Sequence, residues 1–348
     1  MDQRYIDEFS LVAEELEYST QEIAGMLAYA DRLSERHLPV IYNQEHLSLL
    51  CGYKNYYLLW VSNFQERFYT GYRIPKKKHG FREIEEPYPA LKEIQTWILH
   101  NILEPASDEF VSPVAKAFLK GKTLKENARF HRKQKFVISL DIKDFFGNVR
   151  EPLIYGVFRK FGYCKSVATM LTKLCTLRGV LPQGAPTSPM LSNMIFKRAD
   201  DMILRYCRWR KIRYTRYADD LTFSGNEISI RNLIRYVNMM VKNLGFRLNT
   251  EKTKVMGTGM RQMVTGIVVN DIMQVSKTYR DMVRQEVYYC IKFGVANHIE
   301  HINAAAWLRS PRVYLRHLLG KINFILFVNP NDTEFQKYRG WINDILSL

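Results

Sequence analysis

A short apolar strand that ends in a carboxylate constrains the fold of this chain more than any other feature. Along residues 136–142, apolar side chains recur at every second position, and Asp141 lies near the end of the run. This period of two predicts a β-strand. Residues 212–224 predict a hairpin, with Asp219 and Asp220 at its turn. The chain is therefore expected to build a sheet that presents carboxylates where two of its strands end.

Helical spacing dominates both ends of the chain, whereas the middle mixes strands and helices. Ser19 and Glu22 form a capping-box pattern at the start of an N-terminal helix. Residues 72–86 carry basic and apolar residues around a glycine, which predicts a second hairpin. We expect an α+β protein with three parts. These are a helical N-terminal accessory region at 1–70, a mixed region at 71–270 and a helical region at 271–348.

Positive charge is concentrated after the first seventy residues. The net charge is +16, but residues 1–70 hold 11 acidic and 5 basic residues, which leaves +22 for the remainder. Such a basic region is typical of a protein that meets a polyanion, and charge alone does not separate RNA from DNA or a membrane surface. The acidic N-terminal region is a candidate docking site for a partner on charge alone.

The sequence predicts a cytoplasmic protein with no membrane contact. Charged residues occupy the first ten positions, where a signal peptide would need an apolar stretch. No apolar run is long enough to cross a bilayer. The five cysteines are scattered and lack the close spacing of a zinc or redox motif, which favours unpaired thiols in a reducing compartment.

Asp141, Asp219 and Asp220 are candidates for binding metal ions. A carboxylate at a strand end is costly to bury unless a positive charge neutralises it. Magnesium suits this task because it prefers carboxylate oxygens and keeps positions open for water and phosphate. Two such ions can activate an attacking hydroxyl and stabilise a leaving pyrophosphate. An Asp-Asp pair alone is more typical of a solvated turn, so the case for a metal site depends on the residues that flank the pair.

Three motifs resemble those of reverse transcriptases, and they occur in that family's order. Tyr217-Ala218-Asp219-Asp220 is similar to the Tyr-x-Asp-Asp signature. The segment from Asp141 to Phe146 resembles the first catalytic motif, and the segment from Leu181 to Pro189 resembles the next. The resemblance implies an RNA-directed DNA polymerase with the right-hand fold. Fingers and palm would span 71–270, and the helical thumb would span 271–348.

The resemblance also implies roles for individual positions. Asp141, Asp219 and Asp220 would be the catalytic residues that bind two Mg²⁺ ions, with Asp141 and Asp219 as the principal ligands. Phe146 would be an aromatic gate that clashes with a 2′-hydroxyl and so selects dNTPs, and core packing is an equal alternative. One lysine of the triplet 76–78 would contact the triphosphate. We take Lys77, although the sequence does not distinguish it from its two neighbours. The other positions implied to contact the dNTP are Arg82, Asp144, Phe145, Gln183 and Lys252.

Two shorter elements resemble those of bacterial retron reverse transcriptases. Residues 127–131 match the pattern Asn-Ala-x-x-His, and residues 264–266 match Val-Thr-Gly. Lysines and arginines surround the first element, which favours phosphate contacts. For His131, the alternative is a structural histidine with both ring nitrogens bonded. The resemblance implies RNA contacts at Asn127, Ala128, His131, Val264, Thr265 and Gly266.

The retron resemblance implies a specific product. Such an enzyme binds a structured noncoding RNA, primes from an internal 2′-hydroxyl, and copies part of the RNA into a branched RNA–DNA hybrid called msDNA. In that family the systems act in antiphage defence, often with a separate effector protein. One alternative is another bacterial reverse transcriptase, intron-encoded or defence-associated. A second is a non-catalytic RNA-binding scaffold, which the presence of all three carboxylates disfavours.

Overall fold

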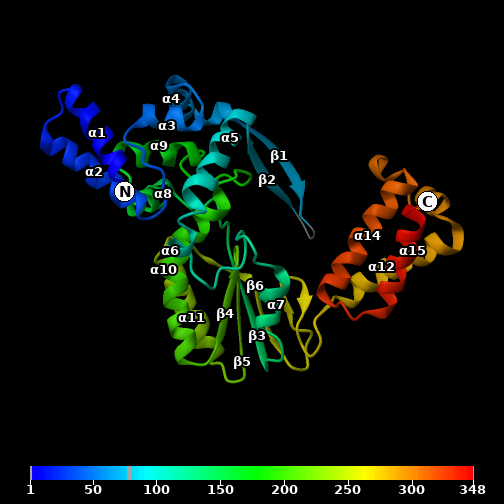
Figure 1. Cartoon of the computed structure of the whole chain (residues 1–348). Coiled ribbons are helices and arrows are strands. Elements are labelled where there is room, and N and C mark those ends of the chain that lie inside the picture. The colour runs from blue at the N-terminus through cyan, green and yellow to red at the C-terminus, as the bar shows by residue number, and fades with distance from the viewer. Residues whose placement is uncertain (1, 77–79, 304, 348) are drawn as a thin grey trace. The chain divides into compact units, whose positions relative to one another are not determined.

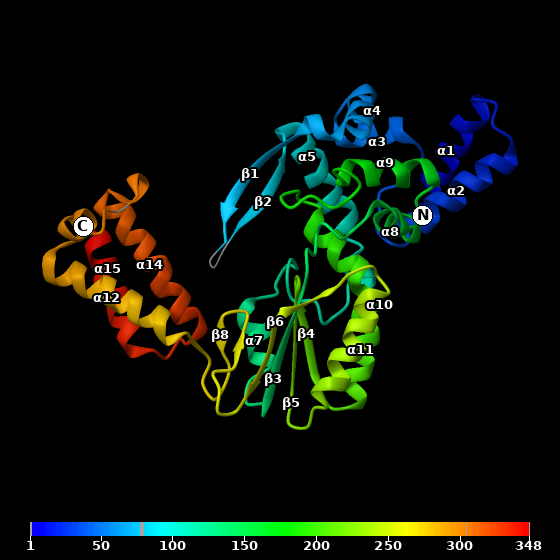
Figure 2. The ribbon, with the colours of Figure 1, turned by 180° about the vertical axis from the view of Figure 1, so that it is seen from behind.

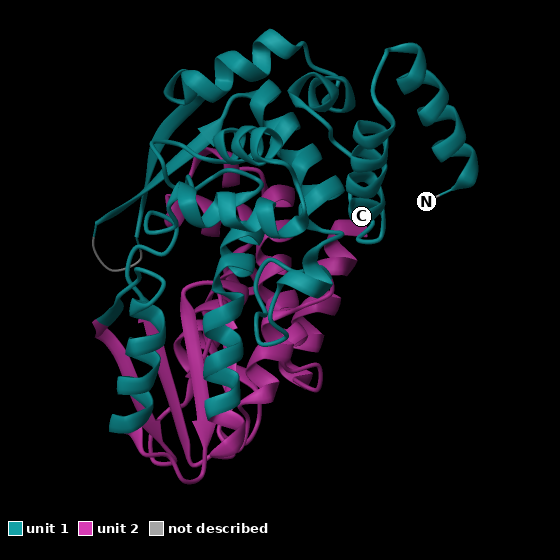
Figure 3. Ribbon diagram, turned by 90° about the vertical axis from the view of Figure 1, so that its left-hand side faces the viewer, with its two compact units in different colours: residues 1–120, 142–206, 231–249 teal, residues 121–141, 207–230, 250–348 magenta. Residues whose placement is uncertain are grey.

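The chain folds into two compact units that are interleaved along the sequence (Figure 3). A computed structural model describes residues 2–76, 80–303 and 305–347. Unit 1 comprises residues 1–120, 142–206 and 231–249, and unit 2 comprises residues 121–141, 207–230 and 250–348. The division of the chain at residues 70 and 270 remains a prediction.

The N-terminal part of unit 1 is helical, as its sequence pattern predicts. Helix α2 begins with the expected capping box, in which Ser19 and Glu22 bond each other's backbone N–H groups. Ile23, Ala30 and Leu33 form the buried face of that helix. The elements are α1 (Gln3–Glu15), α2 (Thr20–Ser34), α3 (Gln44–Cys51), α4 (Asn55–Asn63) and the 3₁₀ turn η1 (Gln65–Phe68).

An antiparallel hairpin and a group of helices complete unit 1. The hairpin predicted around Gly80 is confirmed, and its strands pair from Tyr69 opposite Pro87 to Pro75 opposite Phe81. Helices α10 and α11 are joined by a stacked pair, Tyr206 and Tyr236, whose ring centroids are 4.1 Å apart. The elements are β1 (Tyr69–Pro75), β2 (Phe81–Pro87), α5 (Pro89–Ile98), the π-turn η2 (Leu99–Leu103), α6 (Ser107–Phe110), α8 (Glu151–Phe161), α9 (Lys165–Cys175), α10 (Ser188–Trp209) and α11 (Ile230–Lys242).

Unit 2 is built around a four-stranded sheet with the strand order β4-β5-β3-β6 (Figure 1). Strand β5 pairs antiparallel with both β3 and β4. The predicted strand and the predicted hairpin are therefore both confirmed. Val137, Ile138 and Leu140 are completely buried, which fits a strand with a neighbour on each side. The strands are β3 (Phe136–Ile142), β4 (Arg213–Tyr217), β5 (Asp220–Gly225) and β6 (Leu248–Gly257).

A small second sheet and a helical C-terminal part complete unit 2 (Figure 2). One apolar cluster runs from Val137 on β3 to Phe335 and Ile342 near the end of the chain, so the sheets and the C-terminal helices share a core. Helix α7 (Leu124–Phe130) also contributes Ala128 to this core. The remaining elements are β7 (Met263–Val264), β8 (Ile267–Val268), β9 (Gln274–Val275), α12 (Lys277–Phe293), α13 (Val295–His301), the 3₁₀ turn η3 (Ala306–Leu308), α14 (Pro311–Val328) and α15 (Thr333–Ser347).

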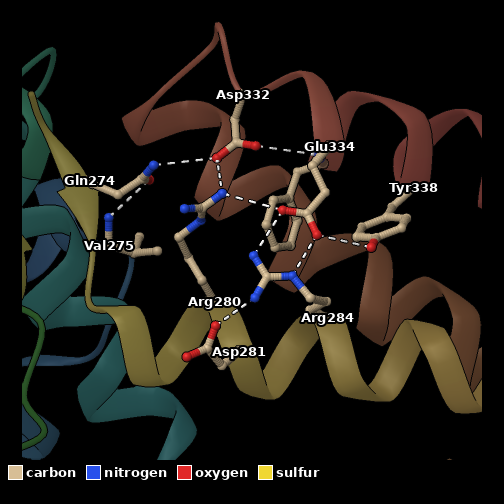
Figure 4. Close-up of polar contacts among 9 residues, drawn as sticks. Gln274, Val275, Arg280, Asp281, Arg284, Asp332, Glu334 and Tyr338 are labelled. Carbon is tan, nitrogen blue, oxygen red and sulfur yellow. Dashed lines mark hydrogen bonds and ion pairs between the residues drawn. The ribbon is translucent and has the colours of Figure 1, made fainter.

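A cluster of charged side chains joins the start of α12 to the start of α15 (Figure 4). Arg284 donates to Glu334 at 2.9 Å, and Arg280 lies 2.7 Å from Asp332. The Tyr338 hydroxyl also donates to Glu334, at 3.0 Å. Hydrogen bonds from Arg284 lower the pKa of Glu334 most, although burial opposes that shift. This cluster fixes the two helices to each other at one end of the C-terminal region.

The predicted α+β class is confirmed by the helices and the antiparallel sheets. All five cysteines are free thiols, as expected, and burial raises the pKa of Cys175 to about 12. Among the described residues, no helix combines the length and apolar character that spanning a membrane requires.

Candidate active site

The three carboxylates predicted to be catalytic lie at one end of the unit 2 sheet. Asp141 on β3 is directly opposite Asp220, the first residue of β5. Residues opposite each other in an antiparallel pair project from the same face, so these two carboxylates share one face of the sheet. Asp219 precedes Asp220 in the turn between β4 and β5. The sheet register therefore brings together residues that are far apart in the sequence.

A buried arginine supports the turn that carries Asp219. Ala218 has a φ of +55°, which is unusual for a residue with a side chain. The guanidinium of Arg216 donates to the carbonyl of Ala218 at 3.1 Å, and the Arg216 side chain is fully buried. This bond stabilises the turn from within the protein. The sequence analysis did not identify Arg216, because an arginine before a turn is usually exposed.

Crowding and burial at this edge act against negative charge. The pKa of Asp220 is raised to about 6, first because the side chain is buried and then because Asp219 and Asp141 lie nearby. The Ser139 hydroxyl donates to Asp220 at 3.3 Å and the positive charge of Lys254 is close, and both lower the pKa, but burial dominates. Ionising Asp220 at neutral pH therefore costs free energy, which positive charge near this edge would offset.

Lys252 on β6 supplies part of that charge. Its ammonium lies 2.9 Å and 3.1 Å from the two carboxylate oxygens of Asp141, and this hydrogen bond raises the pKa of Lys252. The Lys252 side chain remains 61% exposed. The resemblance implies that this lysine contacts the dNTP, whereas in this structure its partner is Asp141.

The donor atoms of this edge fit a hard divalent cation. All three acidic side chains offer carboxylate oxygens, which magnesium prefers. Within the described residues, no group of three or more His, Cys, Asp or Glu side chains is already arranged around a common point for a metal ion. A divalent cation bound here would offset both the burial of Asp220 and its repulsion by Asp141 and Asp219.

In unit 1, the segment after β3 presents the residues predicted to meet the nucleotide. Phe145 is buried and packs against Phe196 and Phe246, with ring centroids 5.8 Å away from each. Phe146 is only partly buried, with Phe118 at a centroid distance of 6.4 Å. Phe145, rather than Phe146, is therefore the main core residue of this segment. Asp144 is exposed, with a φ of +46°.

A residue that the sequence analysis missed holds this segment in place. The amide of Asn148 donates to the carbonyls of Lys143 and Asp144, at 3.0 Å and 2.8 Å. These bonds close the turn on itself and orient its backbone. Asn148 comes four residues after Asp144, and an asparagine at such a position is a turn signal that the sequence already contains.

Gln183 and Arg82 come from two segments of unit 1 that contact each other. The carbonyl of Gln183 accepts from the backbone N–H of Glu85 on β2 at 2.9 Å. Gly184 has a φ of +145°, and a Cβ atom there would lie 2.6 Å from the Glu85 carbonyl oxygen, so only glycine permits this approach. Arg82 is exposed on β2, opposite Ile74. Lys77 lies outside the described residues.

The side chains of the first retron-like element form hydrogen bonds inside unit 2. Asn127, Ala128 and His131 have no exposed surface. The ring nitrogens of His131 bond the hydroxyls of Ser224 and Thr215, at 2.8 Å and 2.7 Å. Burial, with a smaller effect of Arg213, lowers the pKa of His131 to about 3. These side chains have the structural role that was the alternative for His131, and RNA contact at this element remains a prediction.

The hydroxyl partners of His131 lie on two strands. Thr215 is on β4 and Ser224 is on β5, and the Thr215 hydroxyl also bonds the side chain of Asn127 at 2.6 Å. The neutral ring thus ties α7 to both strands of the β4–β5 hairpin.

The second retron-like element is a tight turn that packs against the first. Val264 is buried, and Thr265 and Gly266 have φ values of +46° and +88° between the paired strands β7 and β8. Two residues in the left-handed region are typical of a type I′ hairpin turn. Helix α7 contacts both β7 and β8. RNA contact at Val264, Thr265 and Gly266 also remains a prediction.

Gln262 joins the two elements. Its side chain is buried, and its amide donates to the carbonyls of Gln134 and Lys135, at 2.9 Å and 3.2 Å. The backbone N–H of Lys133 also donates to the carbonyl of Val269, at 3.2 Å. The segment after α7 is thus bonded along its length to the segments that flank the hairpin.

Comparison with known proteins identifies the family of the chain. Residues 74–281 match the family described as "Reverse transcriptase (RNA-dependent DNA polymerase)". Polymerases of this family depend on divalent metal ions. The solved structure of telomerase from Candida albicans, in complex with a fragment of telomeric RNA, aligns with a TM-score of 0.44 and 12% identity. That alignment covers 84% of this chain and 63% of the telomerase.

Relatives of the retron type cover most of the chain. The chain is 32% identical to the retron Ec86 reverse transcriptase of Escherichia coli over 255 residues, which are 72% of this chain and 77% of that protein. It is 29% identical to the retron Mx65 reverse transcriptase of Myxococcus xanthus over 337 residues, 90% of this chain and 75% of the relative. This chain therefore belongs to the reverse transcriptases of the bacterial retron type and is an RNA-directed DNA polymerase with the right-hand fold.

Proposed function

We propose that this polymerase copies part of a structured noncoding RNA into msDNA, a branched RNA–DNA hybrid, starting from an internal 2′-hydroxyl of that RNA. The carboxylate edge of unit 2, in a chain similar to retron reverse transcriptases, is the observation that supports this proposal. The proposal includes a role in antiphage defence with a separate effector protein. The free cysteines fit a reducing, cytoplasmic setting.

Asp141, Asp219 and Asp220 would hold two Mg²⁺ ions. When bound, these ions supply the activation of the attacking hydroxyl and the stabilisation of the leaving pyrophosphate. Lys252 contacts Asp141 in this structure but is largely exposed on a flexible stem. We propose that its ammonium exchanges Asp141 for phosphate oxygens of the incoming dNTP, since a lysine ammonium binds either anion.

The decisive variant is Asp219→Asn, which keeps the size of the side chain and removes its charge. We expect primer extension with dNTPs and Mg²⁺ to fall by at least about a thousandfold, because a charge that binds metal is lost. Binding of the cognate RNA should stay within about twofold. The matched control is Asp344→Asn, an exposed position on α15. Undiminished extension by the Asp219→Asn protein would refute the assignment of the site.

The nucleic acid that copurifies with the protein distinguishes this proposal from its nearest alternative. A retron enzyme should carry RNA joined to DNA through a 2′–5′ branch, detectable after debranching by a change in mobility. An intron-encoded or other defence-associated reverse transcriptase would carry unbranched nucleic acid. A non-catalytic scaffold would bind RNA and show no extension with or without Mg²⁺.

Phe146 provides a separate test of the proposed nucleotide pocket. If its ring blocks the 2′-hydroxyl, the Phe146→Ala variant should lose at least about tenfold of its preference for dNTPs over NTPs. Competition between labelled dNTP and NTP in primer extension measures this ratio. The control is Phe246→Leu, at a buried aromatic residue that packs against Phe145, which should lower thermal stability and leave the ratio unchanged. An unchanged ratio in the Phe146→Ala protein would return Phe146 to a packing role.

A further inference from the structure

A cavity of about 500 Å³ in unit 1 is lined mainly by basic residues. It lies where α2 meets the turn between α8 and α9, outside the segments that the resemblance places at the nucleotide. Five of its eight lining residues are cationic, and none is acidic. The lining residues are Tyr29, Arg32, Arg36, Arg159, Lys160, Gly162, Cys164 and Lys165.

The two arginines of α2 have a structural task in this cavity. Arg36 donates to the carbonyls of Lys160 and Phe161, each at 3.0 Å, and Arg32 donates to that of Gly162 at 3.4 Å. These contacts satisfy carbonyls at the C-terminal end of α8, where cations are favoured. Arg36 also pairs with Glu109 at 3.3 Å. Much of the charge of these two arginines is thus already used by the fold.

Lys160 and Lys165 have no such task. Both are exposed, and within the described residues neither ammonium forms a hydrogen bond or an ion pair. Lys165 is the first residue of α9, whose N-cap, Cys164, makes no capping hydrogen bond through its side chain. The positive end of the α9 dipole therefore adds to the charge of the lysines on the same cavity. Bringing these cations together is unfavourable unless an anion joins them.

Two of the cationic residues around the cavity come from the acidic N-terminal part of the chain. Residues 1–70 carry 11 acidic residues and only 5 basic ones, yet Arg32 and Arg36, two of those five, line this cavity. A general excess of positive charge does not account for basic residues gathered inside the acidic part of the chain. Several cations around one cavity match a ligand of multiple charge, such as phosphate, better than a single carboxylate.

We propose that this cavity is a binding site for phosphate groups, carried by an RNA strand or by a free nucleotide. Lys160, Lys165 and the α9 N-terminus bind the phosphate oxygens, and Arg32 and Arg36 hold the walls of the cavity in place. The proposal does not depend on the polymerisation reaction, because it concerns binding at a separate surface of unit 1.

The test is the double variant Lys160→Gln, Lys165→Gln in the full chain. Its matched control is Arg235→Gln, Lys242→Gln, which removes the same charge from exposed positions of α11. Binding of a fluorescein-labelled single-stranded 20-nucleotide RNA is followed by anisotropy at about 0.1 M salt, and binding of ATP is followed by calorimetry. Metal ions and dNTPs are left out, so a failed retron assignment would not affect the result.

An RNA ligand predicts that the cavity variant binds the RNA at least about tenfold more weakly, with a salt dependence reduced by about one to two ions. A nucleotide ligand predicts the same loss for ATP with RNA binding unchanged. The control variant should change either affinity by less than about twofold. Equal losses in both variants, or no loss in either, would overturn the proposal. A labelled poly-glutamate peptide serves as a third probe. If the cavity variant loses binding to this peptide but keeps its affinity for RNA and ATP, the proposal is overturned in favour of a carboxylate ligand.

Discussion

Unit 2 contains two clusters of charged side chains whose carboxylates respond to the fold in opposite ways. At the carboxylate edge of the β4-β5-β3-β6 sheet, Asp141, Asp219 and Asp220 lie near Lys252 and Lys254. In the cluster that joins α12 and α15, three carboxylates lie near Arg280 and Arg284 (Figure 4). The balance of charges is the same, yet the fold raises the pKa of Asp220 and lowers that of Glu334.

The difference lies in direct contact. Glu334 accepts hydrogen bonds from Arg284 and Tyr338, and these outweigh its burial. Among the described residues, Asp220 forms no ion pair within 4 Å, and its hydroxyl partner Ser139 does not offset its burial. One cluster is therefore electrostatically complete and stabilises the fold. The other leaves a deficit of positive charge beside three carboxylates.

Removing the charge of Glu334 should produce the largest change in stability. We expect Glu334→Gln to lower the free energy of unfolding by about 2–3 kcal/mol at pH 7, because Arg284 loses a charged partner. Chemical denaturation measures this value. The fold lowers the pKa of Glu334, so its contribution is present above the ordinary value of 4.5 and is lost as the pH falls below it. The gap between variant and wild type should close in acid, and a constant gap would contradict this account.

Removing the charge of Asp220 should have a smaller effect of the opposite sign. At pH 7.5 and without metal ions, we expect Asp220→Asn to raise the free energy of unfolding by about 1–2 kcal/mol. The folded pKa of about 6 exceeds the ordinary 3.8, so the wild-type carboxyl costs nothing below pH 3.8 and its full penalty appears above pH 6. The advantage of the variant should therefore vanish near pH 4. A destabilised variant at pH 7.5 would show that the edge is already neutralised.

An exposed ion pair should have the smallest effect on stability, and it is the reference for the Glu334 and Asp220 variants. Arg73 and Glu83 approach to 2.9 Å across the β1–β2 hairpin, but both side chains are about 70% exposed. We expect Glu83→Gln to change the free energy of unfolding by less than about 0.5 kcal/mol at any pH between 4 and 8. A loss comparable to that of Glu334→Gln would mean that direct contact alone, without burial, sets the value of an ion pair here.

Local patterns were sufficient to predict the strands that carry Asp141 and Asp220. The alternation in residues 136–142 and the turn residues near Asp219 act over a few positions, and the structure confirms both elements. The sheet register that places Asp141 opposite Asp220 depends on pairing between distant strands. The family resemblance indicated that the two belong to one site but could not give this register.

Features that depend on tertiary burial could not be predicted in the same way. The pattern around residues 127–131 suggested an exposed basic surface, yet the Asn127 and His131 side chains face inward. Their partners Thr215 and Ser224 lie on strands more than 80 residues away. Arg216 was missed for the same reason, since its buried position exists only in the folded chain. In each case the role of a polar residue depends on tertiary contacts that its local sequence does not specify.

The interleaving of the two units has a consequence for how the protein is made. Strand β3 leaves the ribosome roughly 80 residues before β5, its hydrogen-bonded partner, which at ~5–20 residues per second is a delay of roughly 4–16 s. During that interval its apolar residues have no neighbouring strand, a condition that favours aggregation. The shared core also requires Phe335 and Ile342 from α15. The four-stranded sheet therefore cannot complete its core until α15 has been synthesised, and a nascent chain is expected to depend on chaperones until then.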